Sequence, residues 1–425
     1  MNLKKMIFGI ALIFTSAVVF ASGGKPQGAA ASGGPVTLKV AGWDMMDSVV
    51  YKTLIDAFKK AHPNINVEMV DIPSADYTQK LQVMLNGGSD VDILWIKDGD
   101  TTKGHANRGQ LADLSAYIQR DGIDLKGFNG LAERFNLGGK MVALPVSTGY
   151  YILYYNKDIF DKAGVPYPSN DMTWSQYEQL CAQLTSGSGT DKVYGGFLHT
   201  WNACVQNWGV QDGKNTIMAT DYSFFKPYYE MALRLQTAGY IWDYGSLRTS
   251  GVNYGSAFLQ GNVATLPMGT WFYTTIITRI NNQEANIRWG IAALPHPEGV
   301  PAGWTVGSVT PLAINQASKN KDAAWEFVKF ATGEEGAKIH ASAGSLPARA
   351  NTQTLQSIAN APGMPEGALA ALTVKNITLD RPMEDQVLQI NQMLGEEHSL
   401  IMLGEVTVDQ GLANMAKRSK EIQGK

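Results

Sequence analysis

Cysteine is scarce in this sequence, since Cys181 and Cys204 are the only two among 425 residues. They allow at most one disulfide bond, which an exported location would permit. A second interpretation needs no bond, because Cys181 shares an apolar helical stripe with Trp174 and Tyr177 and would then be an ordinary buried core residue. The sequence alone leaves both interpretations open.

Positive charge does not gather anywhere along the chain. The 35 Lys and Arg against 38 Asp and Glu give a formal net charge of −3, and no basic stripe is present. We therefore expect no nucleic-acid partner. The six histidines lack the paired spacing of metal ligands, so we expect no metal site.

Sequence motifs of common catalytic sites are missing as well. The chain contains no G-x-S-x-G, no P-loop and no H-E-x-x-H. The G-x-G at 187–189 lacks the preceding strand and the following helix of a dinucleotide site. These absences predict a protein that is not an enzyme and that holds no cofactor.

The N-terminus has the pattern of a secretory signal peptide. Lys4 and Lys5 precede an apolar run over 6–20, and small residues follow it. We predict a signal peptide over 1–21 and a flexible linker over 22–35. An uncleaved anchor is the alternative, although the run is short for a membrane span. No cysteine lies near the cleavage site for a lipid anchor, so we expect an exported protein in the periplasm or at the extracellular face, soluble after cleavage.

The chain that follows is long enough for two domains with hydrophobic cores. It begins with an expected strand over 36–41, a helix that ends at His62 and a strand over 65–70. A second helix and a continuous apolar strand over 91–96 come next. This βαβαβ order predicts a parallel, doubly wound sheet, which binds ligands at the carboxyl ends of its strands.

Polar and aromatic residues follow all three of these strands. Trp43 and Asp44 follow the first strand, Asp71 follows the second, and the third carries Trp95 and Asp98. Their convergence at one edge of the sheet predicts a binding cleft. Each residue taken singly is explained as a loop carboxylate or a core tryptophan, and we interpret Asp71 as structural.

The stretch over 138–164 has the pattern of a hinge. After a glycine turn, an apolar run reaches Pro145, which cannot donate a hydrogen bond to a sheet, and Ser147 begins three residues that form strands poorly. We expect the chain to leave one sheet here and to enter another through a new strand over 151–155. Asn156 then caps a helix that Gly164 ends.

The second half of the chain continues with alternating elements. Thr173 and Gln176 form an expected capping box. The patterns predict helices over 224–240, 253–260, 318–332 and 334–341, and strands over 262–268, 288–294 and 309–314. The tail over 383–422 is expected to be helical apart from breaks at Gly395 and Gly404.

Several motifs resemble the extracellular solute-binding proteins of carbohydrate ABC transporters, the family of the maltose-binding protein. They are G-K-x-x-A-L-P followed after seven residues by L-Y-Y-N-K-D-I-F-x-K-A-G, then F-L-Q-G-N-V-A-T-L-P-M-G-T-W, L-P-x-P-E-G with G-W-T-V-G, and S-L-P-A-R. The resemblance implies an α/β fold of two lobes with three hinge crossings, each lobe a mostly parallel sheet flanked by helices. By this analogy lobe one is 36–148 plus 288–345, and lobe two is 149–287 plus 346–425.

The resemblance also implies a set of ligand-binding residues. Asp44 and Asp98 match hydroxyl-binding carboxylates, and Trp271 matches a tryptophan on which a sugar stacks. With Trp43 added from its place at a strand end, the full set is Trp43, Asp44, Trp95, Asp98, Trp201, Trp271, Gly303, Trp304 and Arg349. Arg349 is a weaker candidate, as is Arg381 outside the set. These residue types suit a sugar, because aromatic rings cover its C–H faces and carboxylates accept hydrogen bonds from its hydroxyls.

The function implied by the resemblance is that of the substrate-binding component of an ABC importer. Such a protein captures a sugar or oligosaccharide between its lobes and delivers it to permease subunits, and we expect it to be a monomer. One alternative is a glycerol-phosphate ligand held by Arg349 and Arg381. Another is a secreted polysaccharide-degrading enzyme with Asp44 and Asp98 as its carboxylate pair. A signalling role through a membrane sensor stays open.

Overall fold

The computed structural model describes residues 35–425 apart from 47, 98 and 129. The predicted signal peptide over 1–21 and all but the last residue of the predicted linker lie outside the described residues, as does Asp98. Within the described part of the chain, no helix combines the length and the apolar character that crossing a membrane requires.

Eight strands form one mixed sheet in the order β2-β1-β3-β9-β6-β7, with β8 beside β6 and β10 beside β9. They are β1 (Val36–Trp43), β2 (Ile65–Ile72), β3 (Ile93–Trp95), β6 (Leu144–Asn156), β7 (Thr265–Gly269), β8 (Trp289–Ala293), β9 (Trp304–Ile314) and β10 (Asn376–Leu379). β1 pairs in parallel with β2 and β3, as the βαβαβ order predicts, and β10 pairs in parallel with β9. The pairings of β9 with β3 and of β6 with β7, β8 and β9 are antiparallel.

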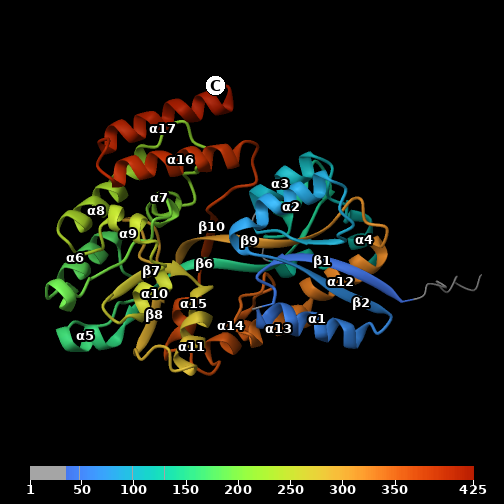
Figure 1. Ribbon diagram of the computed structural model, residues 1–425, viewed down its shortest axis with the longest axis horizontal. Coiled ribbons are helices and arrows are strands. Elements are labelled where there is room, and N and C mark those ends of the chain that lie inside the picture. The colour runs from blue at the N-terminus through green and yellow to red at the C-terminus, as the bar shows by residue number, and fades with distance from the viewer. Residues whose placement is uncertain (1–34, 47, 98, 129) are drawn as a thin grey trace, which may run out of the picture. The chain divides into compact units, whose positions relative to one another are not determined.

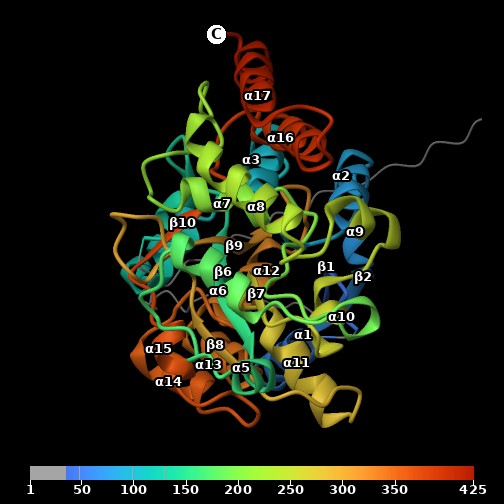
Figure 2. The ribbon, with the colours of Figure 1, turned by 90° about the vertical axis from the view of Figure 1, so that its left-hand side faces the viewer.

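The glycine turn at 138–139 joins the short hairpin strands β4 (Asn136–Leu137) and β5 (Lys140–Met141). The α-helices are α1 (Val49–Ala61), α2 (Tyr77–Asn86), α3 (Gly99–Asn107), α4 (Ser115–Asp121), α5 (Lys157–Ala163), α6 (Trp174–Leu184), α7 (Ala203–Val210), α8 (Lys226–Thr237), α9 (Tyr244–Ser250), α10 (Tyr254–Leu259), α11 (Phe272–Asn281), α12 (Lys321–Thr332), α13 (Glu334–Ser342), α14 (Thr352–Ala359), α15 (Ala368–Leu372), α16 (Val387–Met402) and α17 (Val408–Gln423). Figures 1 and 2 show α2 and α1 on opposite sides of β1 and β2.

Local sequence signals explain several helix ends. The Asn156 side chain accepts hydrogen bonds from the first turn of α5, and Gly164 ends that helix in the left-handed conformation with a φ of 67°. Thr173 and Gln176 form the expected capping box of α6. These predictions are confirmed.

Two separate hydrophobic cores organise the described chain. The first core gathers buried side chains from 38–146 and 309–331 together with Ala348. The second core gathers them from 150–306 and 341–415. Figure 1 shows the elements of the first core on the right and those of the second on the left, with β6 and β9 running between them. Two bodies with their own cores therefore share continuous strands.

The second core includes residues that the resemblance assigns to lobe one. Trp289, Ile291 and Leu294 are buried in it, as is Val306. The reason is strand pairing, because β8 lies antiparallel to the second half of β6, from Ile152 to Asn156, which is itself part of the second core. The chain therefore passes between the cores within β9 and not before β8.

The expected interruption around Pro145 is wrong in one respect. β6 is a single strand from Leu144 to Asn156, although its pairing register with β9 shifts between Pro145 and Ser147. This local irregularity accommodates the missing N–H of Pro145 without ending the strand. The first half of β6 pairs with β9 and the second half with β7 and β8, so the chain does pass from one body to the other here.

The break expected at Gly395 is also wrong. α16 runs through this residue without interruption, whereas Gly404, with a φ of 73°, does follow its end. One glycine costs a helix only about 1 kcal/mol relative to alanine. Burial of Ile390, Met393 and Leu394 in the second core outweighs that cost.

Both cysteines are free and buried. Cys181 lies on the buried stripe of α6 with Trp174 and Tyr177, as the second interpretation of the sequence expects. Burial raises the pKa of each thiol to about 12. The structure therefore contradicts a Cys181–Cys204 disulfide bond.

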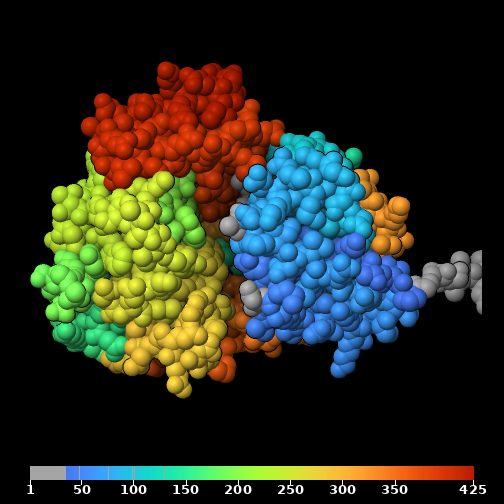
Figure 3. All heavy atoms as spheres, in the orientation of Figure 1, coloured from blue at the N-terminus to red at the C-terminus, as the bar shows by residue number. Residues whose placement is uncertain are grey.

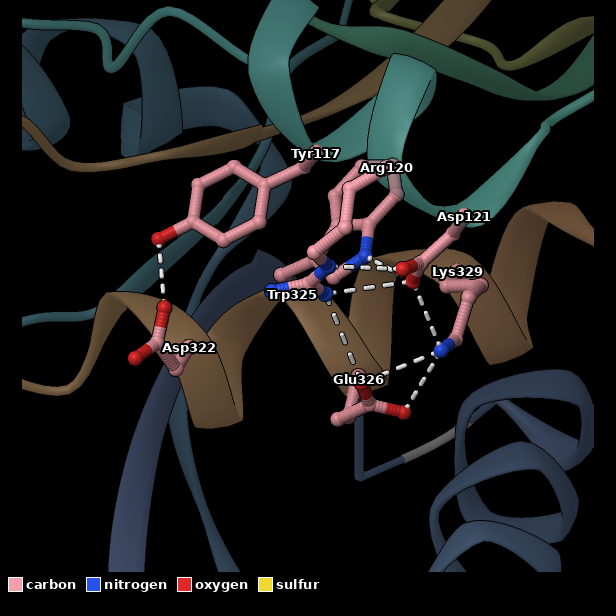
Figure 4. A network of polar contacts seen from close by, with 7 residues as sticks. All are labelled: Tyr117, Arg120, Asp121, Asp322, Trp325, Glu326 and Lys329. Carbon is pink, nitrogen blue, oxygen red and sulfur yellow. Dashed lines mark hydrogen bonds and ion pairs between the residues drawn. The ribbon is translucent and has the colours of Figure 1, made fainter. Parts of the chain in front are cut away.

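A polar network joins α4 to α12 at the outer side of the first core (Figure 4). One carboxylate oxygen of Asp121 accepts hydrogen bonds from Trp325 Nε1 at 2.8 Å and from Lys329 Nζ at 2.9 Å. The Tyr117 hydroxyl donates to Asp322 at 2.7 Å. These contacts fix a helix in the first third of the chain against one about 200 residues later.

Candidate functional site

A cavity of about 820 Å³ lies where the two cores meet. Its walls come from four parts of the chain. The first-core side supplies Trp43, Ser48, Val49, Val50 and Lys97, and the crossing strands supply Ser147, Thr148, Gly149, Ser308 and Thr310. The second-core side supplies Thr270 and Trp271 with Tyr273 and further residues of α11, and the segments over 342–346 and 361–362 supply the rest. Figure 3 shows the molecule hollowed between its blue half and its yellow and green half.

Serine and threonine are the commonest residues of the cavity wall, and three aromatic side chains, Trp43, Trp271 and Tyr273, accompany them. The serine and threonine residues are Ser48, Ser147, Thr148, Thr270, Thr274, Thr275, Thr278, Ser308, Thr310, Ser342 and Ser345. Among the described lining residues, Lys97 and Arg279 carry charge, and Arg279 is paired with Glu284. Such a wall offers many neutral hydrogen-bonding groups together with apolar faces, which fits a polyhydroxylated guest.

Trp43, at the end of β1, is held in place by its neighbours. Its ring contacts Tyr51 edge-on at a centroid distance of 6.3 Å and Tyr77 at 5.3 Å. The Lys97 ammonium lies 5.4 Å from the centroid of the same ring, a cation–π contact. Lys97 also donates to the carbonyl and the hydroxyl of Ser74 at 2.6 and 2.7 Å. The Trp43 ring is therefore held by several neighbours and is only partly exposed to the cavity.

Trp271 follows β7 and precedes α11, where it is 39% exposed. Its ring meets Tyr151 edge-on, with centroids 5.5 Å apart and planes at 82°. The neighbouring Thr270 N–H donates to the Tyr150 carbonyl at 2.9 Å and ties the loop to β6. The exposure of Trp271 matters here because the ring faces the cavity that also carries Trp43 and Tyr273.

The third aromatic candidate at a strand end behaves differently. Trp95 is only 1% exposed and does not line the cavity. It packs edge-on against Tyr51 at 4.6 Å and Phe327 at 6.2 Å in the first core. Trp95 packs against Tyr51, and Tyr51 in turn contacts Trp43 in the cavity wall. Trp95 therefore supports the wall indirectly, from within the first core.

The carboxylates of Asp44 and Asp71 tie the loops after β1 and β2 to each other. Asp44 has a left-handed φ of 48°, and its Oδ1 accepts a hydrogen bond from the Ser74 N–H at 2.9 Å. Asp71 accepts from the N–H groups of Met45 and Met46 at 2.8 and 3.3 Å. These bonds confirm the structural interpretation of Asp71. The remaining carboxylate, Asp98, lies outside the described residues.

Trp201 is 41% exposed but is not among the lining residues of the cavity. Its ring contacts His199 at 4.5 Å and Tyr254 at 5.6 Å. Burial raises the pKa of Tyr254, whose ring also contacts Phe272 edge-on at 5.2 Å. Tyr254 therefore links Trp201 to the first turn of α11, directly after Trp271, and the sequence interpretation missed it because it follows a helix cap and not a strand.

The remaining predicted residues are not among the lining residues of the cavity. Gly303, with a φ of 84°, accepts a hydrogen bond from the Lys375 N–H at 2.8 Å, and Trp304 begins β9 opposite Asn376. Arg349 donates to the Asp124 carbonyl and lies 4.4 Å from the centroid of the Phe128 ring.

Several lining residues were not predicted. Tyr273 is 1% exposed, and its hydroxyl has no hydrogen-bond partner among the residues that the structure describes. Ser147, Thr148, Ser308 and Thr310 lie on the crossing strands β6 and β9. The run T-W-F-Y-T-T-I-I-T at 270–278 is the signal that could have identified the α11 side, since its hydroxyl residues cluster beside Trp271.

Comparison with known proteins defines the class. Residues 42–338 match the family of bacterial extracellular solute-binding proteins, and the chain belongs to that family. It is 42% identical to a sugar transporter from Rhizobium etli solved in an open conformation, with a TM-score of 0.82 over 91% of this chain and 99% of that chain. It is 27% identical over 315 residues to a lactose-binding protein from Rhizobium radiobacter, which covers 70% of each chain.

A further solved structure supports the fold. A substrate-binding protein from Listeria monocytogenes in complex with cycloalternan has a TM-score of 0.80 over 92% of this chain and 99% of that chain, at 24% identity. The two-lobe α/β fold expected from the sequence is confirmed.

Proposed function

We propose that this protein is the substrate-binding component of an ABC importer, which captures a sugar or oligosaccharide and delivers it to membrane permease subunits. The observation that carries this proposal is the cavity between the two cores, with Trp43 on one wall, Trp271 on the other and hydroxyl groups between them. Family membership and the relatives named for lactose and for arabino-oligosaccharides support it.

Closure of the two bodies is the mechanism that this arrangement supports. We assign 36–148 and 307–345 to lobe one, and 149–306 and 346–425 to lobe two, which moves the second crossing into β9. A ligand that contacts both walls only when they approach one another shifts the equilibrium toward the closed state. The closed protein then presents both lobes to the permease, acting as a monomer and without catalysis.

In this proposal, the two cavity tryptophans cover the C–H faces of the sugar, and hydroxyl side chains on the crossing strands exchange hydrogen bonds with its hydroxyls. Asp44 and Asp98 accept further bonds. Trp201, through Tyr254, extends the aromatic surface beyond the cavity, which would suit a second sugar ring.

The cationic alternative finds less support in the described cavity. Arg349 lies on Phe128, and Arg381 lies 3.6 Å from its neighbour Asp380, with only 14% of its side chain exposed. Neither arginine lines the cavity. The two cationic residues among the described lining residues are engaged, since Lys97 donates to Ser74 and Arg279 pairs with Glu284. A phosphate ligand would require cationic groups that turn toward it.

A thermal-shift screen of the purified protein tests the proposal. The panel contains lactose, maltose, arabino-oligosaccharides and other neutral sugars, with glycerol 3-phosphate as the charged comparison. We expect a neutral sugar to raise Tm, because ligand at 100 times its Kd stabilises the folded state by about 2.7 kcal/mol. A rise with phosphorylated compounds alone, or hydrolysis of an oligosaccharide by the pure protein, would contradict the proposal.

A further inference from the structure

Two glycines lie directly beneath the Trp271 indole. A Cβ atom added to Gly269, the last residue of β7, would lie 2.0 Å from both Cζ3 and Cη2 of Trp271. A Cβ added to Gly149 in β6 would lie 3.1 Å from Cε3 of the same ring. Carbon atoms that are not bonded pack at about 3.5–4.0 Å, so the first position excludes any side chain while the ring stays where it is.

Backbone conformation does not require glycine at either position. Neither Gly149 nor Gly269 has a positive φ, and both lie in strands where glycine forgoes side-chain packing and conformational stability. The indole is the nearest neighbour above both positions, and at Gly149 the Thr270 Oγ1, at 3.8 Å, lies beside it. We therefore attribute the absence of a side chain at these positions to the space that the Trp271 indole occupies, and not to the backbone conformation of the strands.

A further neighbour contacts the Trp271 indole. Tyr151 meets it edge-on, with ring centroids 5.5 Å apart. The ring nevertheless stays 39% exposed and lines the cavity. A ring that is held in place before the ligand arrives loses little conformational entropy on binding.

We propose that Gly269 and Gly149 are positioning residues, which set the plane of Trp271 and thereby the orientation in which a sugar ring can stack on it. This proposal rests on the proposed sugar-binding function. Gly149 lies on β6 between Val146 of the first core and Tyr150 of the second, so the platform is built on a strand that joins the two bodies.

The test compares Gly269→Ala, Gly149→Ala and Trp271→Ala by isothermal titration with the sugar that raises Tm most. We expect Gly269→Ala to raise Kd at least tenfold and Gly149→Ala about threefold, since its contact is less severe. Gly395→Ala is the matched control, because this glycine has no positive φ and a Cβ there would meet nothing within 4 Å. We expect its Kd to be unchanged.

A double mutant separates positioning from a general structural effect. Added to Trp271→Ala, the Gly269→Ala change should cause no further rise in Kd, because its only route to the ligand is removed. An equal rise in both backgrounds, or no rise in the wild-type background, would overturn the proposal. If Gly269→Ala fails to fold, as judged by circular dichroism, the same cycle with Gly149→Ala decides.

A measurement without ligand tests the positioning of Trp271 independently of whether the protein binds a sugar. The near-UV circular dichroism difference between wild type and Trp271→Ala reports the ordered indole. We expect Gly269→Ala to change that difference band and Gly395→Ala to leave it intact. An unchanged band would overturn the positioning role, whereas failure of every sugar to bind would overturn only the sugar-binding function.

Discussion

The two walls of the cavity present their tryptophans in different ways. On the first-core wall, Trp43 is wedged against Tyr51 and Tyr77 with the Lys97 ammonium over its ring. On the second-core wall, Trp271 lies on backbone and leaves a broad face toward the cavity. The first wall therefore offers a fixed edge beside a charge, and the second offers the main apolar platform. Binding energy should consequently be distributed unequally between the walls.

The largest expected effect concerns the support behind the first wall. Trp95→Ala should lower the free energy of unfolding by about 3–5 kcal/mol, because the side chain is 1% exposed and packs on Tyr51 and Phe327. Urea denaturation followed by fluorescence or circular dichroism measures this loss. Trp95→Phe is the conservative variant, and we expect it to fold and to bind the sugar with the same Kd as the wild type. A stable Trp95→Phe protein that no longer binds sugar would instead place Trp95 in the site.

The next effect compares the two walls directly. Trp271→Ala should raise the sugar Kd about thirtyfold or more, which corresponds to the roughly 2 kcal/mol typical of a tryptophan hot spot. Trp43→Ala should raise Kd about tenfold, because less of its ring faces the cavity, and it should also lower Tm through lost contacts with Tyr77. Isothermal titration of both variants checks the order. A larger loss for Trp43→Ala would reverse the comparison.

The contrast between Trp95 and Trp43 also shows that local sequence pattern does not predict which strand-end tryptophan is buried. Both are the last residues of parallel strands, and the local pattern gives both the same position at the sheet edge. What separates them is Phe327 of α12, which lies far along the chain and buries Trp95. Local signals, such as the Asn156 cap of α5 and the capping box at Thr173, could be predicted because neighbours in sequence make them. Contacts between distant segments could not.

The same reasoning explains the other differences. β8 belongs to the second core through its register with β6, and Gly395 stays helical through packing in that core. Neither the core to which β8 belongs nor the helical conformation of Gly395 can be deduced from the residues next to them in the sequence. Trp271 was predicted from its motif, yet Tyr254 was missed, because only the folded chain brings α10 against the start of α11.

A smaller effect is expected on the outer side of the first core, away from either wall. Hydrogen bonds from Arg120, Trp325 and Lys329 hold the pKa of Asp121 well below its usual value of 3.8 (Figure 4). A lowered folded-state pKa stabilises the fold above the unfolded value and loses that contribution as pH falls through the folded value. Asp121→Asn should therefore lower Tm at pH 7, and its difference from wild type should shrink below about pH 4.

Binding measurements on this variant show whether the outer side is independent of the wall. We expect the sugar Kd of Asp121→Asn at pH 7 to match that of wild type, because neither α4 nor α12 lines the cavity. Thermal denaturation across pH 3–7 supplies the stability profile. A Tm difference that grows on acidification would show that Asp121 is not the stabilising charge.

The smallest effect is expected behind the second wall, at Gly395 within α16. Replacement by alanine should raise the free energy of unfolding by up to about 1 kcal/mol, because the helix continues through this residue and a Cβ there meets nothing within 4 Å. Denaturant titration measures the gain. If binding energy resides in the walls alone, this stabilised protein should bind the sugar with an unchanged Kd, so that stability and affinity move independently. A changed Kd would mean that α16 takes part in the approach of the two bodies, and the division between wall and support would no longer hold for the second core.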